Sequence, residues 1–115
     1  MKTTLDFDEL ELLKFFSTEP YGEHSDGLFY YKVARDGIEL TFSFNYLDQS
    51  VQTRLVHNEN EVDCSVGENA IGIKIIDLKQ GKKLSVEFES KEFDFRLEVK
   101  IDPKINVNWI MLRDL

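Results

Sequence analysis

Apolar and polar residues alternate along most of the chain after residue 26, and this alternation is the strongest signal in the sequence. In 38–46, five apolar side chains alternate with four polar ones, and 84–88 and 93–101 repeat the pattern. A period of two is typical of a strand with one face in the core and the other in water. Weaker alternation predicts further strands at 27–34, 51–57, 62–66, 70–78 and 105–111.

Turn residues separate these predicted strands. Asp36-Gly37 is a signal for a tight hairpin, and polar residues near 48–50, 58–61, 80–81 and 90–92 mark further turns. Strands spaced about 8–12 residues apart favour an antiparallel meander, here of about eight strands. We therefore expect a mainly β (α+β) fold in one domain over 1–115, with the sheet over 27–112 forming a sandwich or a partly closed barrel.

A helix is predicted over 6–17, ahead of the strands. Asp6 or Asp8 suits its N-cap, and Pro20 disfavours helical geometry in the residue before it. We expect the apolar stripe of this helix to cover an open end of the sheet. The apolar positions at helical spacing are Leu10, Leu13 and Phe16, widened by Leu12 and Phe15.

The apolar positions of the three clearest strands are expected to form one continuous face. Another layer must cover such a face, so either the sheet curls on itself or the helix closes one end of it. The positions in this face are Ile38, Leu40, Phe42, Phe44, Leu84, Val86, Phe88, Phe93, Phe95, Leu97, Val99 and Ile101.

The composition is that of an acidic globular protein. The chain has 115 residues, of which 42% are hydrophobic, and its 22 acidic and 14 basic side chains give a net charge of −8. An apolar fraction near the globular norm of about 45% excludes a disordered chain. Like charges repel nucleic acid phosphates and anionic lipids, so we expect neither nucleic acid nor a membrane as partner.

The first residues and the cysteine count predict a cytoplasmic protein. Acidic residues interrupt 1–11 where a signal peptide needs an apolar run. With Cys64 as the single cysteine, no intramolecular disulfide can form.

The sequence carries no catalytic or metal-binding motif. Cys64 could pair with His57 or His24 as nucleophile and base. However, Val62 and Val66 stand two residues to either side of Cys64, so we expect its side chain on the buried face, as an inert part of the core. His24, His57 and Cys64 lack the compact spacing of a metal site. We expect no catalytic residue, no metal and no cofactor, and therefore a protein that is not an enzyme.

Aromatic side chains are the first candidates for contacts with a partner. Tyr30 and Tyr31 are adjacent, so one of them must point to the outer face of its strand. Exposed Tyr and Trp are common anchors of protein interfaces, and Trp109 is the third candidate. The alternative is that these rings pack at a sheet edge with only their polar atoms in water.

Acidic segments are the second candidates. Residues 57–69 contain Glu59, Glu61, Glu68 and Asp63 and no lysine or arginine, and residues 1–23 contain six acids against two lysines. Single-signed charge speeds the encounter with a basic partner. The alternative is that this charge only keeps the protein soluble, for which a net charge of about 2–8 is ordinary.

Three segments resemble a group of small uncharacterised bacterial β-rich proteins. They are Phe15-Phe16-Ser17-Thr18-Glu19-Pro20, Phe29-Tyr30-Tyr31, and Ile101 to Trp109. In size, acidity and β content the chain is also similar to immunity proteins that neutralise bacterial toxins. The resemblance implies a binding protein and supplies no catalytic residue.

The leading hypothesis is a non-enzymatic acidic protein that binds a basic protein partner, as an immunity protein does, through Tyr30, Tyr31, Glu59, Glu61, Glu68 and Trp109. The alternative is a barrel-like protein that encloses a small apolar ligand. An unpaired sheet edge would also allow a homodimer.

Overall fold

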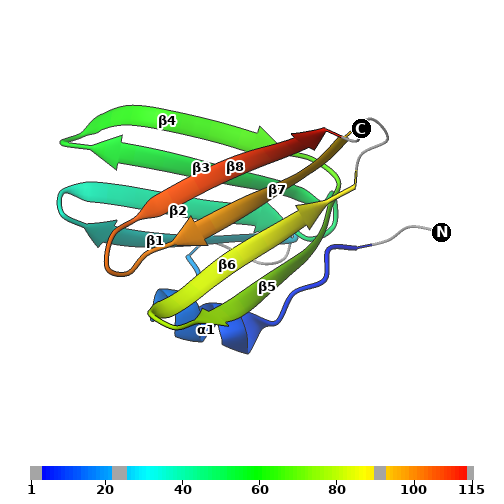
Figure 1. The fold of residues 1–115 in the computed structure, drawn as a ribbon, viewed down its shortest axis with the longest axis horizontal. Coiled ribbons are helices and arrows are strands. Elements are labelled where there is room, and N and C mark those ends of the chain that lie inside the picture. Colours follow the sequence, from blue (N-terminus) through cyan, green and yellow to red (C-terminus); the bar gives the residue numbers. More distant parts are fainter. Residues whose placement is uncertain (1–3, 22–25, 90–92, 114–115) are drawn as a thin grey trace.

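Two four-stranded antiparallel sheets face each other in the computed structural model, which describes residues 4–21, 26–89 and 93–113 (Figure 1). The first sheet has the order β1-β2-β3-β4, with bounds Leu28–Arg35, Ile38–Asn45, Ser50–His57 and Asn60–Gly67. The second has the order β5-β6-β7-β8, with bounds Ala70–Leu78, Gly81–Phe88, Phe93–Lys100 and Asn106–Arg113. Within each sheet every pair joins strands that are neighbours in sequence, and the chain passes from one sheet to the other between β4 and β5. The predicted eight antiparallel strands are confirmed, and of the two predicted forms the fold takes the sandwich.

The hairpin predicted at Asp36-Gly37 joins β1 to β2. Arg35 pairs with Ile38, which leaves two residues in the turn. Asp36 has φ 53° and Gly37 has φ 79°, and a two-residue hairpin turn with positive φ at both positions matches the twist of its strands.

The core lies between the two sheets. The expectation of one continuous apolar face was wrong, because β2 belongs to one sheet and β6 and β7 to the other, so their apolar faces are opposed layers. Side chains from both sheets are fully buried in this layer, among them Phe42, Phe44, Leu84, Val86, Leu97 and Val99. The side chain of Phe93 lies outside the described residues.

The helix is shorter than the predicted 6–17. α1 spans Glu9–Phe16, and the Asp8 carboxylate caps it by accepting hydrogen bonds from the backbone N–H of Leu10 (3.0 Å) and Glu11 (3.2 Å). The preceding residues are extended because their backbone pairs with both sheets. Leu5 N–H donates to the Tyr46 carbonyl (3.1 Å), and Asp6 N–H donates to the Ile71 carbonyl (3.1 Å).

The helix covers the edge of the sandwich formed by β1 and β5, as Figure 1 shows. Leu12, Phe15 and Phe16 are buried against the sheets, whereas Leu10 is 57% exposed. Leu10 was wrongly placed in the buried stripe because the helix begins at Glu9, and the stripe that faces the sheets runs through positions i, i+3 and i+4 from Leu12. No helix in the described ranges is long and apolar enough to cross a membrane.

Candidate functional site

The edge of the sandwich opposite the helix is formed by β4 and β8, and β4 has the reverse of the usual polarity. The register pairs Ser65 with Thr53, a buried residue of β3. Ser65 therefore lies on the core side of β4, and Val62 and Val66 point away from the core, each 60% exposed. At this edge the apolar side chains of the strand face solvent and the polar ones face the other sheet.

The reversed polarity corrects the prediction for Cys64. Its thiol is exposed, and the Gln52 side-chain amide donates to its sulfur at 3.1 Å. The prediction of a buried thiol was wrong because a valine two residues away shows which face is shared but not which face is inside.

The structure also separates the candidate nucleophile from its candidate base. Cys64 pairs with Arg54 and His57 pairs with Asn60. The three strand positions between Arg54 and His57 correspond to about 10 Å. His24 lies outside the described residues, and within the described part of the chain no three His, Cys, Asp or Glu residues are grouped to hold a metal ion.

Trp109 lies between the two sheets at the sandwich edge, partly buried, so its role as a partner contact stays a prediction. It pairs with Leu97, a fully buried residue of β7, and its indole N–H donates to the Thr53 hydroxyl of the first sheet at 2.9 Å. Gly67 makes room for it, because a Cβ at this position would lie 2.8 Å from the Trp109 ring and 2.7 Å from the Phe88 ring.

Beside Trp109 the sandwich opens into a groove of about 320 Å³ between the two edge strands, which we call the β4–β8 groove. Its lining is apolar except for one hydroxyl, and Met111 is 65% exposed within it. The groove exists because the core side of β4 carries Gly67, Ser65 and Asp63, which are too small or too polar to fill the space opposite β8. The lining residues are Ser65, Val66, Phe95, Trp109, Ile110 and Met111.

The acidic residues predicted to contact a partner follow β4 as a line rather than forming one patch. Glu59 lies in the turn before β4 and Glu68 directly follows it, so they are roughly 25–30 Å apart along an extended strand. Glu61 is paired with Arg54 (Oε1 to Nε, 2.6 Å), which leaves Glu59, Asp63 and Glu68 as exposed acids along this edge.

The two adjacent tyrosines point to opposite faces, as predicted. Tyr31 has no exposed surface and therefore cannot touch a partner in this fold. Tyr30 lies on the outer face of the first sheet, stacked on Tyr21 with ring centroids 5.9 Å apart. This places Tyr30 on a different face from the β4–β8 groove.

The buried hydroxyl of Tyr31 is the one side-chain group in the described chain with a clearly perturbed proton affinity. Burial, together with the nearby carboxylates of Glu9 and Glu19, raises the pKa of Tyr31 to about 12, and burial is the largest of these causes. The hydroxyl has no hydrogen-bond partner among the described residues. Tyr31 thus stays neutral and belongs to the core.

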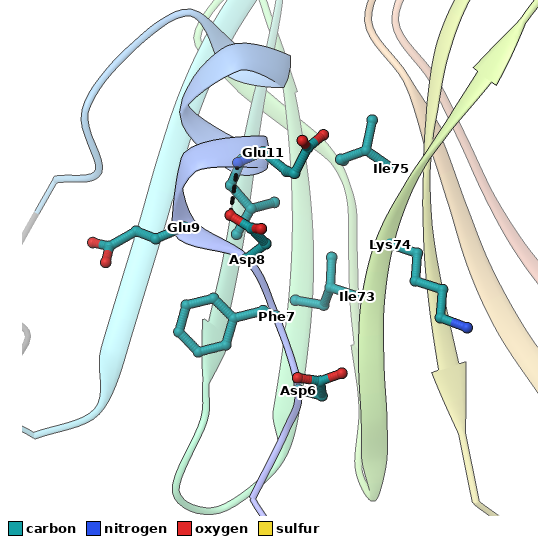
Figure 2. A pocket seen from close by; sticks show the side chains of 9 residues that line it. Asp6, Phe7, Asp8, Glu9, Glu11, Ile73, Lys74 and Ile75 are labelled. Carbon is teal, nitrogen blue, oxygen red and sulfur yellow. Dashed lines mark hydrogen bonds between the residues drawn. The ribbon is translucent and has the colours of Figure 1, made fainter.

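A second hollow, of about 660 Å³, lies between the N-terminal segment and β5. Figure 2 shows Asp6, Asp8 and Glu11 beside it, whereas the side chains of Glu9 and Lys74 point away from it on opposite sides. Four of the six N-terminal acids singled out in the sequence lie around this hollow, whereas Glu19 does not line it and Glu23 lies outside the described residues. Asp8 is already engaged in capping the helix, and this hollow is polar where the β4–β8 groove is apolar.

No protein-family model matches the chain, and no curated protein matches it in sequence. Among solved structures, it is similar to a chain of the "Contact-dependent growth inhibition toxin - immunity protein complex from Klebsiella pneumoniae 342", with a TM-score of 0.87 and 25% sequence identity. The match covers 94% of this chain and 97% of that chain. The chain resembles a protein of a toxin–immunity pair. The similarity to immunity proteins predicted from size, acidity and β content is thereby confirmed.

Sequence reasoning missed the residues that shape the groove of this immunity-protein-like fold. Met111 and Val66 read as ordinary core positions of their strands, and Gly67 carries no turn signal. The composition of 60–67 could have indicated the groove. This segment contains only two large apolar residues, so it cannot supply a full row of core side chains to a sandwich.

Proposed function

We propose that this protein is an immunity protein, a non-enzymatic inhibitor that binds a bacterial toxin and blocks its activity. The observation that carries the proposal is the match, over nearly the full length of both chains, to a protein of a toxin–immunity complex. The surface features fit this role, since the described chain presents grooves and exposed apolar side chains that can contact another protein. The cytoplasmic location stays a prediction.

The test is rescue from a toxin. The probe is the toxin encoded beside this protein's gene, expressed from an inducible promoter with and without this protein. We expect growth arrest without the protein, growth with it, and a complex of defined stoichiometry by calorimetry. An adjacent gene whose product is not toxic, or a toxin that the protein neither binds nor neutralises, would contradict the proposal.

The finer part of the proposal is that the partner is basic. The net charge of −8 and the exposed acids along β4 favour encounter with a positively charged surface. Reversing Glu59, Glu61 and Glu68 to lysine should slow association strongly at low salt and much less at high salt, because salt screens exposed charges.

The matched control changes the net charge by the same amount elsewhere. Glu19, Asp77 and Glu87 are exposed and lie outside the β4 edge, so reversing these three should slow association much less. Equal association rates for the two triple variants would show that only total charge matters, and an unchanged rate for both would remove the basic partner from the proposal.

A further inference from the structure

The β4–β8 edge and the outer face of the second sheet around Glu98 offer different surfaces to another protein. On the outer face of the second sheet, the Glu98 carboxylate lies 3.0 Å from Lys83 Nζ and 3.5 Å from Arg96 Nε. These three charged side chains are therefore paired with one another. Along β4, by contrast, Val62 and Val66 are exposed and the next strand edge across the groove carries the exposed Met111. Apolar side chains that gather at one edge mark an interaction surface.

Both strands that flank the groove are edge strands. β4 pairs only with β3 and β8 pairs only with β7, so each has one edge without a partner strand in the described chain. Backbone groups at such an edge can bond another chain. The β4–β8 groove therefore combines an apolar floor, an indole ring and two open strand edges in one place.

The charge around the groove decides between a second copy of this chain and another protein. β4 and the residues after it carry Glu61, Asp63 and Glu68, and β8 carries no acidic residue and one charged residue, Arg113 at its end. Two copies that met through this groove would bring these acids together in a chain that already has a net charge of −8. A segment with an apolar side chain between lysine or arginine residues has the opposite, complementary charge.

We propose that the β4–β8 groove is the surface that holds the toxin, and that its occupant is a basic segment of the toxin with an apolar anchor. The anchor packs against Trp109 and Met111, and the flanking cations face Asp63 and Glu68. This inference rests on the proposed function, and it adds the docking surface and the chemistry of the toxin segment that fits it.

The first test measures toxin affinity after the groove is made polar. Met111→Glu and Val66→Glu each place a carboxylate among the lining side chains. Each also adds a negative charge, which by itself would favour a basic partner. A loss of affinity therefore has to come from the apolar contact, and we expect at least a tenfold weaker Kd for each variant.

Leu10→Glu is the matched control. Leu10 is 57% exposed, similar to Val66, and lies on the helix at the opposite edge of the sandwich (Figure 1). It adds the same charge, so its Kd should stay within about twofold of the wild type, a change well under 1 kcal/mol. Circular dichroism and thermal melts of all three variants show whether they fold.

A second measurement follows the environment of Trp109 in the groove by ¹⁹F NMR. Trp109 is the only tryptophan of the chain, so incorporating 5-fluorotryptophan gives a single ¹⁹F resonance inside the groove. We expect this resonance to shift on addition of unlabelled toxin to the wild type. It should not shift at the same toxin concentration in Met111→Glu.

The outcomes separate this inference from the proposed function. If the wild type binds toxin and both groove variants bind it equally well, the docking surface is elsewhere and the immunity role stands. If Glu11→Lys, in the acidic hollow of Figure 2, abolishes binding while the groove variants do not, the toxin occupies that hollow and the inference is overturned.

The oligomeric state gives another outcome. If the wild type sediments as a dimer and Met111→Glu sediments as a monomer, the groove is a homodimer interface and the inference is overturned. A wild type that binds no toxin would refute the proposed function itself.

Discussion

The two long edges of this sandwich are built in opposite ways. At the β1–β5 edge, Phe16 of the helix stacks on Tyr31 (4.7 Å between centroids) and on Phe42 (5.6 Å). At the β4–β8 edge, Trp109 lies opposite Gly67 and contacts Phe88 (5.6 Å between centroids), and no helix of the described chain covers these rings. One edge is closed by a helix that stacks its ring on the sheet, and the other is left partly open as the β4–β8 groove.

The difference separates the part of the molecule that stabilises the fold from the part available for binding. Buried aromatic rings contribute much of the stability of a small domain, and those at the closed edge have little exposed surface. The open edge has exposed Met111, Val62 and Val66, whose removal leaves the core intact. We therefore expect substitutions at the closed edge to change stability and those at the open edge to change binding.

The largest effect is expected from Phe16→Ala. It removes a buried ring from between the helix and the first sheet, and deletions of this kind cost about 3–5 kcal/mol. The free energy of unfolding from urea titration checks this. Leu10→Ala, on the same helix but exposed, should change it by less than about 0.5 kcal/mol, and equal losses for the two variants would show that the helix does not seal this edge.

The next largest effect is a loss of folding stability at alkaline pH, caused by Tyr31 at the closed edge. The folded pKa of Tyr31, about 12, lies above the ordinary value of about 10. Between these pH values the unfolded chain releases the Tyr31 proton and the folded chain retains it, so stability falls as the pH rises. The loss reaches roughly 2 kcal/mol by pH 12.

Tyr31→Phe should abolish this contribution to the alkaline loss and leave neutral-pH stability unchanged or higher by about 1 kcal/mol, since a buried hydroxyl without a partner is removed. Unfolding titrations at pH 7 and above pH 10 provide the comparison. Tyr30→Phe, on the outer face of the same strand, should keep the alkaline loss of the wild type. An identical pH response of Tyr31→Phe and the wild type would contradict the assignment.

Gly67→Ala is expected to lower the stability of the fold although Gly67 lies at the open edge. The new methyl group would meet the Phe88 and Trp109 rings at 2.7 and 2.8 Å, and overpacking of this kind costs about 1–3 kcal/mol. Gly72→Ala is the matched control, because the nearest atom to its added Cβ is the Asp6 carbonyl oxygen at 3.8 Å. Similar unfolding free energies for the two variants would show that the contact of Gly67 with Trp109 is loose.

The smallest effect is expected at Cys64. Because its thiol is exposed, a thiol reagent should label it in the folded protein as fast as in urea, and Cys64→Ser should change stability by no more than about 0.5 kcal/mol. Protection of the thiol in the folded state would mean that the outer face of β4 is covered in solution.

Much of the fold could be predicted from the sequence because alternation and turn residues are local signals. The strands were placed within two residues of their ends except for the start of β6, which lies three residues earlier than predicted, and the turn at Asp36-Gly37 was identified by residue type alone. What the local signals could not provide was the division into two sheets. Which of two alternating faces lies inside depends on the opposing layer, and no residue within one strand reports it.

The same limit explains the candidate site. Glu59 and Glu68 are exposed as predicted, because charge alone keeps them in water. Cys64 was placed on the wrong face, because the inside of β4 is set by the register with β3 and not by the valines of the strand itself. The β4–β8 groove is a property of two strands separated by about 40 residues, and its prediction would have required knowing that they lie side by side.

The backbone hydrogen bonds of Leu5 and Asp6 with both sheets determine when the N-terminal segment can fold. All strand pairs join neighbours in sequence, so each hairpin can form as soon as its own residues have been synthesised, and such local contacts favour fast folding. The N-terminal segment is different, because Asp6 bonds Ile71 and Ile73 in the second half of the chain. This segment leaves the ribosome before β5 and must therefore wait until β5 has emerged before it can dock.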